Sequence, residues 1–180
     1  MEHQNNMAYS SRAHNNKASS ESELKSTPLI DVTLAILYQE GRFLMQLRDD
    51  LPHIAYPGVW GFFGGHIEPG EAADSGIRRE LIEELAYAPP VLDLFFTQSD
   101  DKVRRCFYHG ELSVPVSSLV LGEGQDLALC SVAEVRAGQK YSVRLAEIRP
   151  LGKPHQQALL DFIDSGLMYS SPISLADKDR

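Results

Sequence analysis

Three glutamates, Glu80, Glu83 and Glu84, stand close together in a segment whose apolar residues recur at the spacing of a helix. On a helix with about 100° of rotation per residue, their carboxylates fall within about 100° of one another. Like charges at this spacing destabilise a helix by a few tenths of a kcal/mol per pair. A hard divalent cation would offset the repulsion, because Mg²⁺ and Mn²⁺ take oxygen ligands and commonly bridge carboxylates to phosphates. The pattern therefore predicts a metal site, with a solvated acidic helix face as the alternative.

The residues before this helix also suit a ligand site. Gly64 and Gly65 let the backbone approach a ligand closely, since neither carries a side chain. Glu71 stands at the beginning of the helix, where a negative charge is favoured. Its carboxylate can also hold Arg79 from outside the helix.

Helical projection places the remaining side chains of the segment. Glu84 lies about 20° from Ile77, a member of the apolar stripe, so it is expected at the boundary between core and solvent. Arg79 projects away from Glu80 and Glu84, so a divalent cation suits these carboxylates better than this arginine does.

Together, these charged residues and the glycine that precedes them resemble the Nudix box, G-x5-E-x7-R-E-U-x-E-E-x-G-U, in which U is aliphatic. The match covers residues 65–87, and every charged position agrees at the right spacing. It departs at Ala86, where the family has glycine, and at Phe63, where many members have proline. Alanine in a left-handed conformation costs on the order of 1 kcal/mol, so a changed helix end is expected at Ala86, without loss of activity.

Nudix enzymes hydrolyse a nucleoside diphosphate linked to another group X. The resemblance implies this activity, a divalent-metal cofactor (Mg²⁺ or Mn²⁺) and a Nudix-type α/β/α sandwich with a mixed β-sheet. The implied metal ligands are the carbonyl of Gly64 and the carboxylates of Glu80, Glu83, Glu84 and Glu123. The implied catalytic residues are Glu83, Glu84, Glu123 and Arg79, and the residues that hold the motif in shape are Gly65, Glu71 and Arg79. Phosphoryl transfer agrees with such a site, because it needs charge neutralisation and an aligned water more than a covalent nucleophile.

Glu123 lies outside the box, in the loop 122–125 with the sequence Gly-Glu-Gly-Gln. Mutator-type nucleoside triphosphate pyrophosphohydrolases, a Nudix subgroup, carry a similar Glu-Gly-Gln loop at a similar distance after the box, and there the glutamate reaches the metal site. The resemblance therefore implies that Glu123 is a metal ligand or the general base. The alternatives are a helix carboxylate as the base and a solvated turn residue at Glu123.

Four residues are candidates for binding substrate. Arg48 ends the second expected strand, and in the mutator-type relatives an arginine near this point contacts substrate phosphate; a surface ion pair with a neighbouring aspartate is the alternative. Trp60, Phe62 and Tyr56 could stack on a base, because aromatic faces tolerate any base. We expect one of them to line the pocket and the others to belong to the core. Alternation places Trp60 and Phe62 on the same face of the chain.

The composition limits the class of protein. The chain has 180 residues, of which 43% are hydrophobic and 23% charged, and this excludes a wholly disordered chain. A formal net charge of −8 disfavours nucleic-acid polymers as partners. No apolar run approaches the roughly 20 residues of a membrane helix. Cys106 and Cys130 form no CxxC motif and are expected in strands, buried and inert. We expect a reduced, cytoplasmic protein without a membrane partner, as a monomer or homodimer.

The elements that must position these residues follow from the patterning. Residues 1–27 are polar and predict a flexible tail, and residues 28–180 predict a single domain. Strands are expected at 29–38, 42–48, 59–63, 91–98, 103–112 and 127–130. Helices are expected at 72–86, 132–137 and 154–165. Many strands with few helices favour an α/β (α+β) fold with a mixed sheet flanked by helices.

The expected substrate is a (deoxy)nucleoside triphosphate, a small molecule. The proline that marks many ADP-ribose hydrolases is missing from residues 101–103, and Tyr108 stands too late for the tyrosine of dinucleoside polyphosphate hydrolases. A nucleotide sugar or an ADP-ribose-type compound is the alternative substrate. A non-catalytic, nucleotide-sensing Nudix module is the alternative class. An isopentenyl diphosphate isomerase is disfavoured. That family uses an active-site cysteine, whereas Cys106 and Cys130 are not expected in loops, and the glutamates of the hydrolases are all present.

Overall fold

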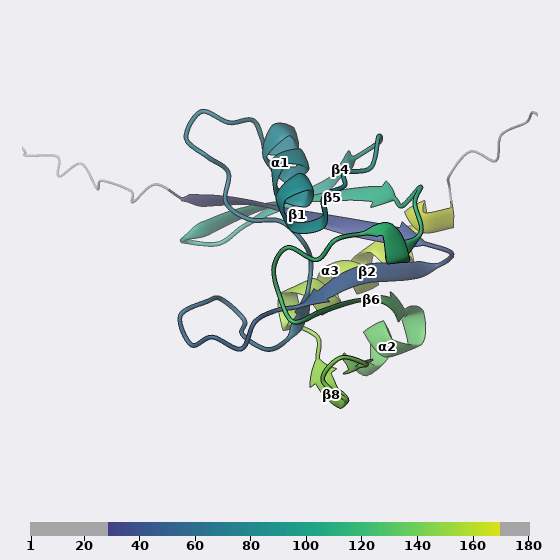
Figure 1. Ribbon diagram of the computed structural model, residues 1–180. Helices are drawn as coiled ribbons and strands as arrows, with labels where there is room; N and C mark the ends of the chain where they lie inside the picture. The colour runs from purple at the N-terminus through teal and green to yellow at the C-terminus, as the bar shows by residue number, and fades with distance from the viewer. Residues whose placement is uncertain (1–28, 170–180) are drawn as a thin grey trace, which may run out of the picture.

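The computed structural model describes residues 29–169. The predicted tail, residues 1–27, and the last part of the predicted domain lie outside the described residues. At the centre is a six-stranded mixed sheet (Figure 1). Its strands are β1 (Ile30–Gln39), β2 (Arg42–Leu47), β3 (Trp60–Gly61), β4 (Asp93–Ser99), β5 (Val103–Glu111) and β6 (Asp126–Ser131). They run in the order β3-β2-β1-β5-β4, with β6 also paired to β2, and only the β1–β5 pair is parallel among these ladders.

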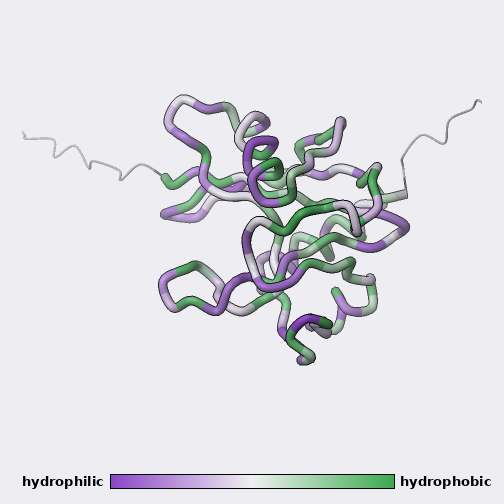
Figure 2. The backbone as a smooth tube through the Cα atoms, in the orientation of Figure 1, coloured by the Kyte–Doolittle hydropathy of each residue, from purple (hydrophilic) through white to green (hydrophobic). Residues whose placement is uncertain are grey.

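Helices cover both faces of this sheet. They are α1 (Ala73–Leu85), α2 (Val132–Ala137) and α3 (Lys153–Ser165), with the 3-10 turns η1 (Val116–Ser118) and η2 (Leu167–Tyr169). Along β1, Ala35 and Leu37 join the core cluster that contains the apolar stripe of α1, whereas Ile36 and Tyr38 join the cluster that contains α3. This alternation divides the core into two layers. The predicted α/β/α sandwich with a mixed sheet is therefore confirmed, and Figure 2 shows hydrophobic residues along the central strands.

The segment 60–67 inserts between β1 and β2. These two strands pair with each other only near their turn, from Leu37↔Leu44 to Gln39↔Arg42. Farther from the turn, Phe63 and His66 bridge to β1, and the Thr33 N–H donates to the Gly65 carbonyl at 2.9 Å. Gly64 adopts a φ of +124°, and a Cβ there would lie 2.2 Å from the Thr33 carbonyl oxygen. Only glycine fits this position beneath α1.

The end of α1 differs from the expectation at Ala86. This alanine takes the left-handed conformation, with φ 53° and ψ 24°, and its N–H donates to the Ile82 carbonyl at 2.9 Å. The helix end is therefore not changed by the missing glycine; the alanine adopts the conformation that a glycine would take there, at an energetic cost.

The other helices mostly follow their sequence signals. The helix α2 has the predicted bounds, with a capping box of Ser131 and Glu134 at its beginning and Gly138 in the left-handed conformation at its end. A hairpin of β7 (Gln139–Ser142) and β8 (Glu147–Pro150) was not expected. Its apolar residues are largely exposed, so it lacks the buried alternation that signals a strand. No helix within residues 29–169 is long and apolar enough to span a membrane.

Candidate active site

Helix α1 turns one carboxylate inward and leaves another in solvent. Its apolar stripe, Ile77, Leu81 and Leu85, is buried against the sheet. Glu84 adjoins this stripe and is only 6% exposed, so it lies deeper than the boundary position that projection predicts. The side chain of Glu83 is 59% exposed on the outer face.

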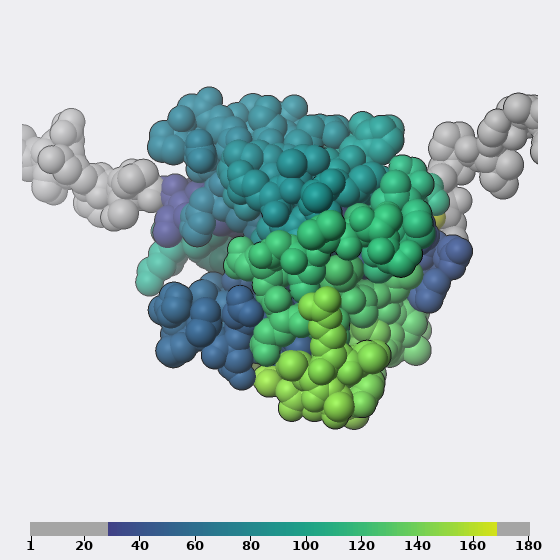
Figure 3. Space-filling model, in the orientation of Figure 1, coloured from purple at the N-terminus to yellow at the C-terminus, as the bar shows by residue number. Residues whose placement is uncertain are grey.

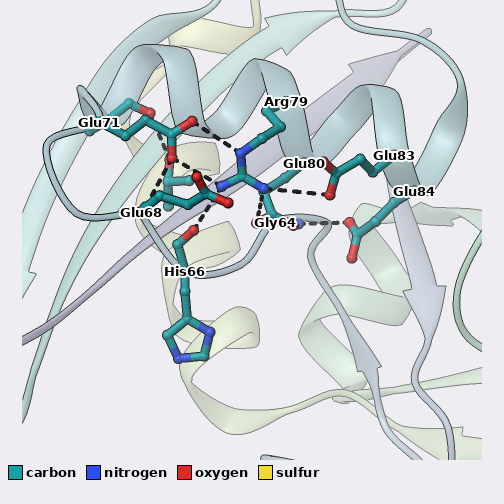
Figure 4. Close-up of polar contacts among 10 residues, drawn as sticks. Gly64, His66, Glu68, Glu71, Arg79, Glu80, Glu83 and Glu84 are labelled. Carbon is teal, nitrogen blue, oxygen red and sulfur yellow. Dashed lines mark hydrogen bonds and ion pairs between the residues drawn. The ribbon is translucent and has the colours of Figure 1, made fainter.

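Glu84 is held by the backbone of the inserted segment. The Gly64 N–H donates to its Oε2 at 2.9 Å (Figure 4). Burial raises the Glu84 pKa to about 7; the Gly64 N–H lowers the pKa, while the negative charges of Glu123 and Glu80 raise it further. The negative charges of Glu80, on the same helix, and of Glu123, on a separate loop, therefore both act on the buried Glu84 carboxylate.

Arg79 forms a two-point ion pair with Glu71. Its Nε and Nη2 donate to the two oxygens of that carboxylate, each at 3.0 Å, and Nη2 also donates to the His66 carbonyl at 3.0 Å (Figure 4). The guanidinium lowers the Glu71 pKa below its ordinary value. The predicted contact between Glu71 and Arg79 is present, and it ties the loop before α1 to the helix.

The expectation that Arg79 points away from Glu80 is wrong. Its Nη1 donates to Glu80 Oε1 at 2.8 Å and to Glu83 Oε2 at 3.4 Å. Helical projection follows the Cα–Cβ direction, whereas the long arginine side chain carries its guanidinium round to the side of its neighbours. Because Gly65 has no side chain, the Glu80 carboxylate lies against its backbone; a Cβ there would be 2.7 Å from both Glu80 oxygens.

The loop that carries Glu123 packs on the end of α1. The Gly122 N–H donates to the Glu84 carbonyl at 2.7 Å, and Gln125 donates from its backbone to Leu47 and from its side chain to Arg48, at 2.7 and 2.8 Å. These bonds clamp the loop between α1 and the end of β2. The clamp brings Glu123 close enough to Glu84 to raise its pKa.

The chemistry of this donor set fits a hard divalent cation. Within residues 29–169, no group of three His, Cys, Asp or Glu side chains already stands at metal-ligand geometry. Instead, Arg79 engages Glu80 and Glu83, and the Gly64 N–H engages Glu84. The carboxylate charge that acts on buried Glu84 is repulsive, and a cation taking oxygen ligands would relieve it.

Two of the three aromatic candidates belong to the core, as expected. Trp60 and Phe62 lie on one face of the chain, as alternation predicts, but they are 0% and 1% exposed. The Trp60 indole N–H donates to the Lys140 carbonyl at 3.1 Å. Neither ring is free to stack on a base, so the expectation that they bind substrate is not supported. Tyr56, in contrast, is 46% exposed.

Arg48 lies beside Tyr56 at the end of β2. Its Nε donates to the Ala55 carbonyl at 3.0 Å, and within the described residues it forms no ion pair with a neighbouring aspartate. Burial lowers the pKa of His155 on α3, and the positive charge of Arg48 lowers it further. The surface ion pair expected as an alternative for Arg48 is therefore absent from the part of the chain that the structure describes.

Two buried polar residues of the site were not found from the sequence. The Gln46 side chain donates to the Phe62 carbonyl at 3.0 Å, and its amide also lowers the Glu84 pKa. The Phe62 N–H donates to His155 Nδ1 at 3.3 Å. The sequence signal that could have pointed to them is a polar residue inside an apolar pattern. Gln46 stands in a buried strand, and His155 stands on the buried helix stripe that contains Ala158 and Phe162.

Comparison with known proteins places the site in a family context. Residues 28–160 match the family model described as the NUDIX domain. The chain is 31% identical over 108 residues to CTP pyrophosphohydrolase of Escherichia coli (strain K12), which covers 59% of this chain and 78% of that protein. It is 34% identical over 55 residues to the nucleoside triphosphatase NudI of Escherichia coli O1:K1 / APEC, covering 30% of this chain. The matched part spans only 38% of the length of NudI.

Solved structures resemble the fold at low sequence identity. The MutT protein from Methanosarcina mazei Go1 has a TM-score of 0.57 at 18% identity, covering 77% of this chain and 96% of that chain. The NUDIX domain of Shewanella oneidensis NrtR, complexed with ADP ribose, has a TM-score of 0.59 at 19% identity, covering 77% and 89%. At these identities the likeness shows the fold alone.

Proposed function

The chain belongs to the Nudix family of pyrophosphohydrolases, and on that premise we propose that it hydrolyses a pyrophosphate bond of a nucleoside triphosphate with Mg²⁺ or Mn²⁺. The observation that carries the proposal is the buried Glu84 carboxylate at the end of α1, held by the Gly64 N–H and acted on by the negative charges of Glu123 and Glu80. The CTP pyrophosphohydrolase and the nucleoside triphosphatase among the relatives favour a triphosphate.

Glu80, Glu83, Glu84, Glu123 and the Gly64 carbonyl would hold the metal. When bound, a divalent cation neutralises phosphate charge and acidifies a bound water. Arg79 keeps the Glu71 loop in register with the helix, while its contacts to Glu80 and Glu83 balance their charge in the free enzyme.

Glu84 is the residue we assign as general base. The Gly64 N–H orients its carboxylate, and burial keeps its pKa at about 7, so it can accept a proton from water near neutral pH. Glu123 is the alternative base, because it approaches the same site from the loop 122–125.

Arg48 and Tyr56 would contact the substrate. The Arg48 guanidinium donates to the protein only through Nε within the described residues, so its Nη atoms can donate to phosphate. The exposed Tyr56 ring replaces Trp60 and Phe62 as the candidate for stacking on the base.

The test is a hydrolysis panel with Mg²⁺, covering canonical and oxidised nucleoside triphosphates, nucleotide sugars, ADP-ribose and dinucleoside polyphosphates, with every product identified. The Glu83→Gln variant should lose most activity and keep its thermal transition, because that side chain is largely exposed. Glu40→Gln removes an exposed carboxylate from the β1–β2 turn and should leave the rates unchanged. Equal activity in Glu83→Gln and wild type would contradict the site assignment.

The other outcomes decide between the alternatives. Turnover of ADP-ribose or a nucleotide sugar in preference to triphosphates would favour the second substrate class, which the ADP-ribose complex of the Shewanella neighbour suggests. Tight nucleotide binding without turnover would favour a nucleotide-sensing module. Size-exclusion chromatography with light scattering would decide between the predicted monomer and homodimer, and the cytoplasmic location stays a prediction.

A further inference from the structure

Gln46 is a buried glutamine in a strand whose inner residues are otherwise apolar. Its exposed fraction is 1%. Alternation along β2 places it with Leu44 on the face that α1 covers, whereas Met45 and Leu47 belong to the core cluster on the face of α3. A buried amide costs free energy unless its polar atoms have partners, and an apolar side chain would avoid that cost. The position of this glutamine therefore requires partners that an apolar residue could not serve.

One partner of Gln46 is a backbone carbonyl at a change of strand pairing. The chain pairs with β2 at residues 60–61 and then crosses to β1, where Phe63 forms a bridge. The Phe62 carbonyl lies at this crossing, between the two ladders. The Gln46 Nε2 donates to it at 3.0 Å, so the side chain supplies a donor where the β3 ladder has ended.

The other partner of Gln46 is the carboxylate of Glu84. Burial raises the pKa of this carboxyl, and the hydrogen bonds from the Gly64 N–H and from the Gln46 side chain lower it. The bond from Gly64 reaches Oε2 at 2.9 Å (Figure 4). Because a side-chain amide has two N–H groups, Gln46 can serve the Phe62 carbonyl and the carboxylate together. Two donors, one from β2 and one from the inserted segment, therefore orient a single buried carboxylate.

The loop 122–125 encloses the amide of Gln46. Gly124 adopts a φ of +91°, and a Cβ there would lie 3.0 Å from the Gln46 Oε1 and 2.8 Å from the Leu47 carbonyl oxygen. The loop passes this close because residue 124 has no side chain. In Figure 3 the green atoms of the segment that contains this loop lie against the teal atoms of α1, to which Gly122 is hydrogen-bonded. The amide is thus surrounded by α1, the inserted segment and the loop that carries Glu123.

We propose that Gln46 is a positioning residue, whose side-chain amide ties the Glu84 carboxylate to the inserted segment and so determines where this carboxylate meets the metal. The inference rests on the proposed function, which assigns a divalent cation to Glu84. A group that hydrogen bonds to a metal ligand orients that ligand, and its loss costs about 10–100-fold in metal affinity or activity. Gln46 acts in this way through Glu84.

The decisive variant is Gln46→Met. Methionine is unbranched and flexible, so it can fill the same buried space, but it has no N–H to donate. Isothermal titration of the nucleotide-free protein gives the Mn²⁺ dissociation constant, which should rise roughly tenfold in the variant. The kcat with Mg²⁺ should fall by a similar factor, while the KM for the nucleotide stays unchanged.

Gln39→Met is the matched control. The Gln39 Nε2 on β1 also joins two backbone carbonyls, those of Leu112 and Val114, each at 3.1 Å. Its replacement removes the same kind of hydrogen bonds without removing a donor to Glu84. The Mn²⁺ dissociation constant and kcat of Gln39→Met should equal those of wild type.

A double-mutant comparison separates positioning of Glu84 from a purely structural role. In the Glu84→Gln background, Gln46→Met should weaken Mn²⁺ binding much less than in wild type, because the ligand through which it acts is already changed. An equal loss of affinity in both backgrounds would overturn the inference, since Gln46 would then act only on the fold of the inserted segment. Unchanged Mn²⁺ affinity in a folded Gln46→Met variant would also overturn it.

NMR of the wild-type chain tests the inference even if Gln46→Met does not fold. With ¹⁵N-labelled glutamine, the side-chain amide resonances of Gln46 should shift on addition of Mg²⁺, whereas those of Gln39 should not. Gln46 resonances that do not respond to Mg²⁺ would show that its amide does not hold a metal ligand.

The metal titrations need no turnover, so they also separate this inference from the proposed function. If Mn²⁺ binding depends on Gln46 but no triphosphate is hydrolysed, the hydrolase proposal fails and the positioning role stands. If triphosphates are hydrolysed and Gln46→Met keeps the wild-type Mn²⁺ affinity, the positioning role fails alone. If the wild-type chain binds no Mn²⁺, both fail.

Discussion

Replacing Glu84 by glutamine should stabilise the metal-free protein at alkaline pH. The folded state raises the pKa of this carboxyl from its ordinary 4.5 to about 7, chiefly through burial. Folding therefore favours the protonated form, and ionisation of Glu84 costs stability. Its contribution is fully present below pH 4.5 and is lost as the pH rises through 7. Glutamine stays neutral and can still accept the Gly64 N–H.

The magnitude follows from the same pKa. At about 1.36 kcal/mol per pKa unit, a rise from 4.5 to about 7 corresponds to about 3 kcal/mol as an upper bound. This is a large fraction of the roughly 5–15 kcal/mol that stabilises a typical domain. Glu84→Gln should therefore exceed wild type by about 2–3 kcal/mol at pH 8 and by little at pH 4.5.

The assay is urea unfolding in EDTA at several pH values between 4.5 and 8.5, for wild type and variant in parallel. The difference between the two proteins isolates Glu84. His155 also makes stability depend on pH, because its lowered pKa costs stability as the pH falls below its ordinary value of 6.5, but it does so equally in both proteins. Added Mg²⁺ should stabilise wild type at pH 8 more than the variant, because a cation favours the ionised carboxylate.

A variant that is no more stable than wild type at pH 8, or a difference that does not change with pH, would refute this reasoning. Either result would mean that Glu84 is not held in the buried, charge-repelled position beside Gly64. It would also remove the main argument for Glu84 as general base.

Two further predictions concern the same motif. Ala86→Gly should raise the free energy of unfolding by about 0.5–1 kcal/mol and leave kcat unchanged. Glycine relieves the left-handed strain at φ 53°, and its greater freedom in the unfolded chain offsets part of that gain. A thermal or urea denaturation that shows destabilisation would contradict this prediction. Arg79→Lys should lower kcat by about 10–100-fold. Lysine keeps the charge, but it cannot make the two-point bond to Glu71 while also reaching Glu80. Steady-state rates within twofold of wild type would show that the paired contacts are dispensable.

The sequence by itself determined the parts of this protein that depend on local spacing. The helix over α1, the arc of Glu80, Glu83 and Glu84, and the facing of Trp60 and Phe62 follow from helix and strand periods, which are constant along the chain. The capping box of α2 was equally local, since its two partners stand three residues apart. The strands of the central sheet were predicted from apolar runs, and burial of these runs stabilises the strands in the fold.

Only the tertiary structure decided which side chains reach the site and which are sealed away. Trp60 and Tyr56 are both aromatic and close in sequence, yet one is buried in the core and the other is exposed, because the core closes over β3 and not over the loop before it. Arg79 contacts the helix glutamates through side-chain conformations that projection does not contain. His155 meets Phe62 across 93 residues of chain, and no period or spacing encodes a contact at that distance. Its position depends on how α3 packs on the sheet.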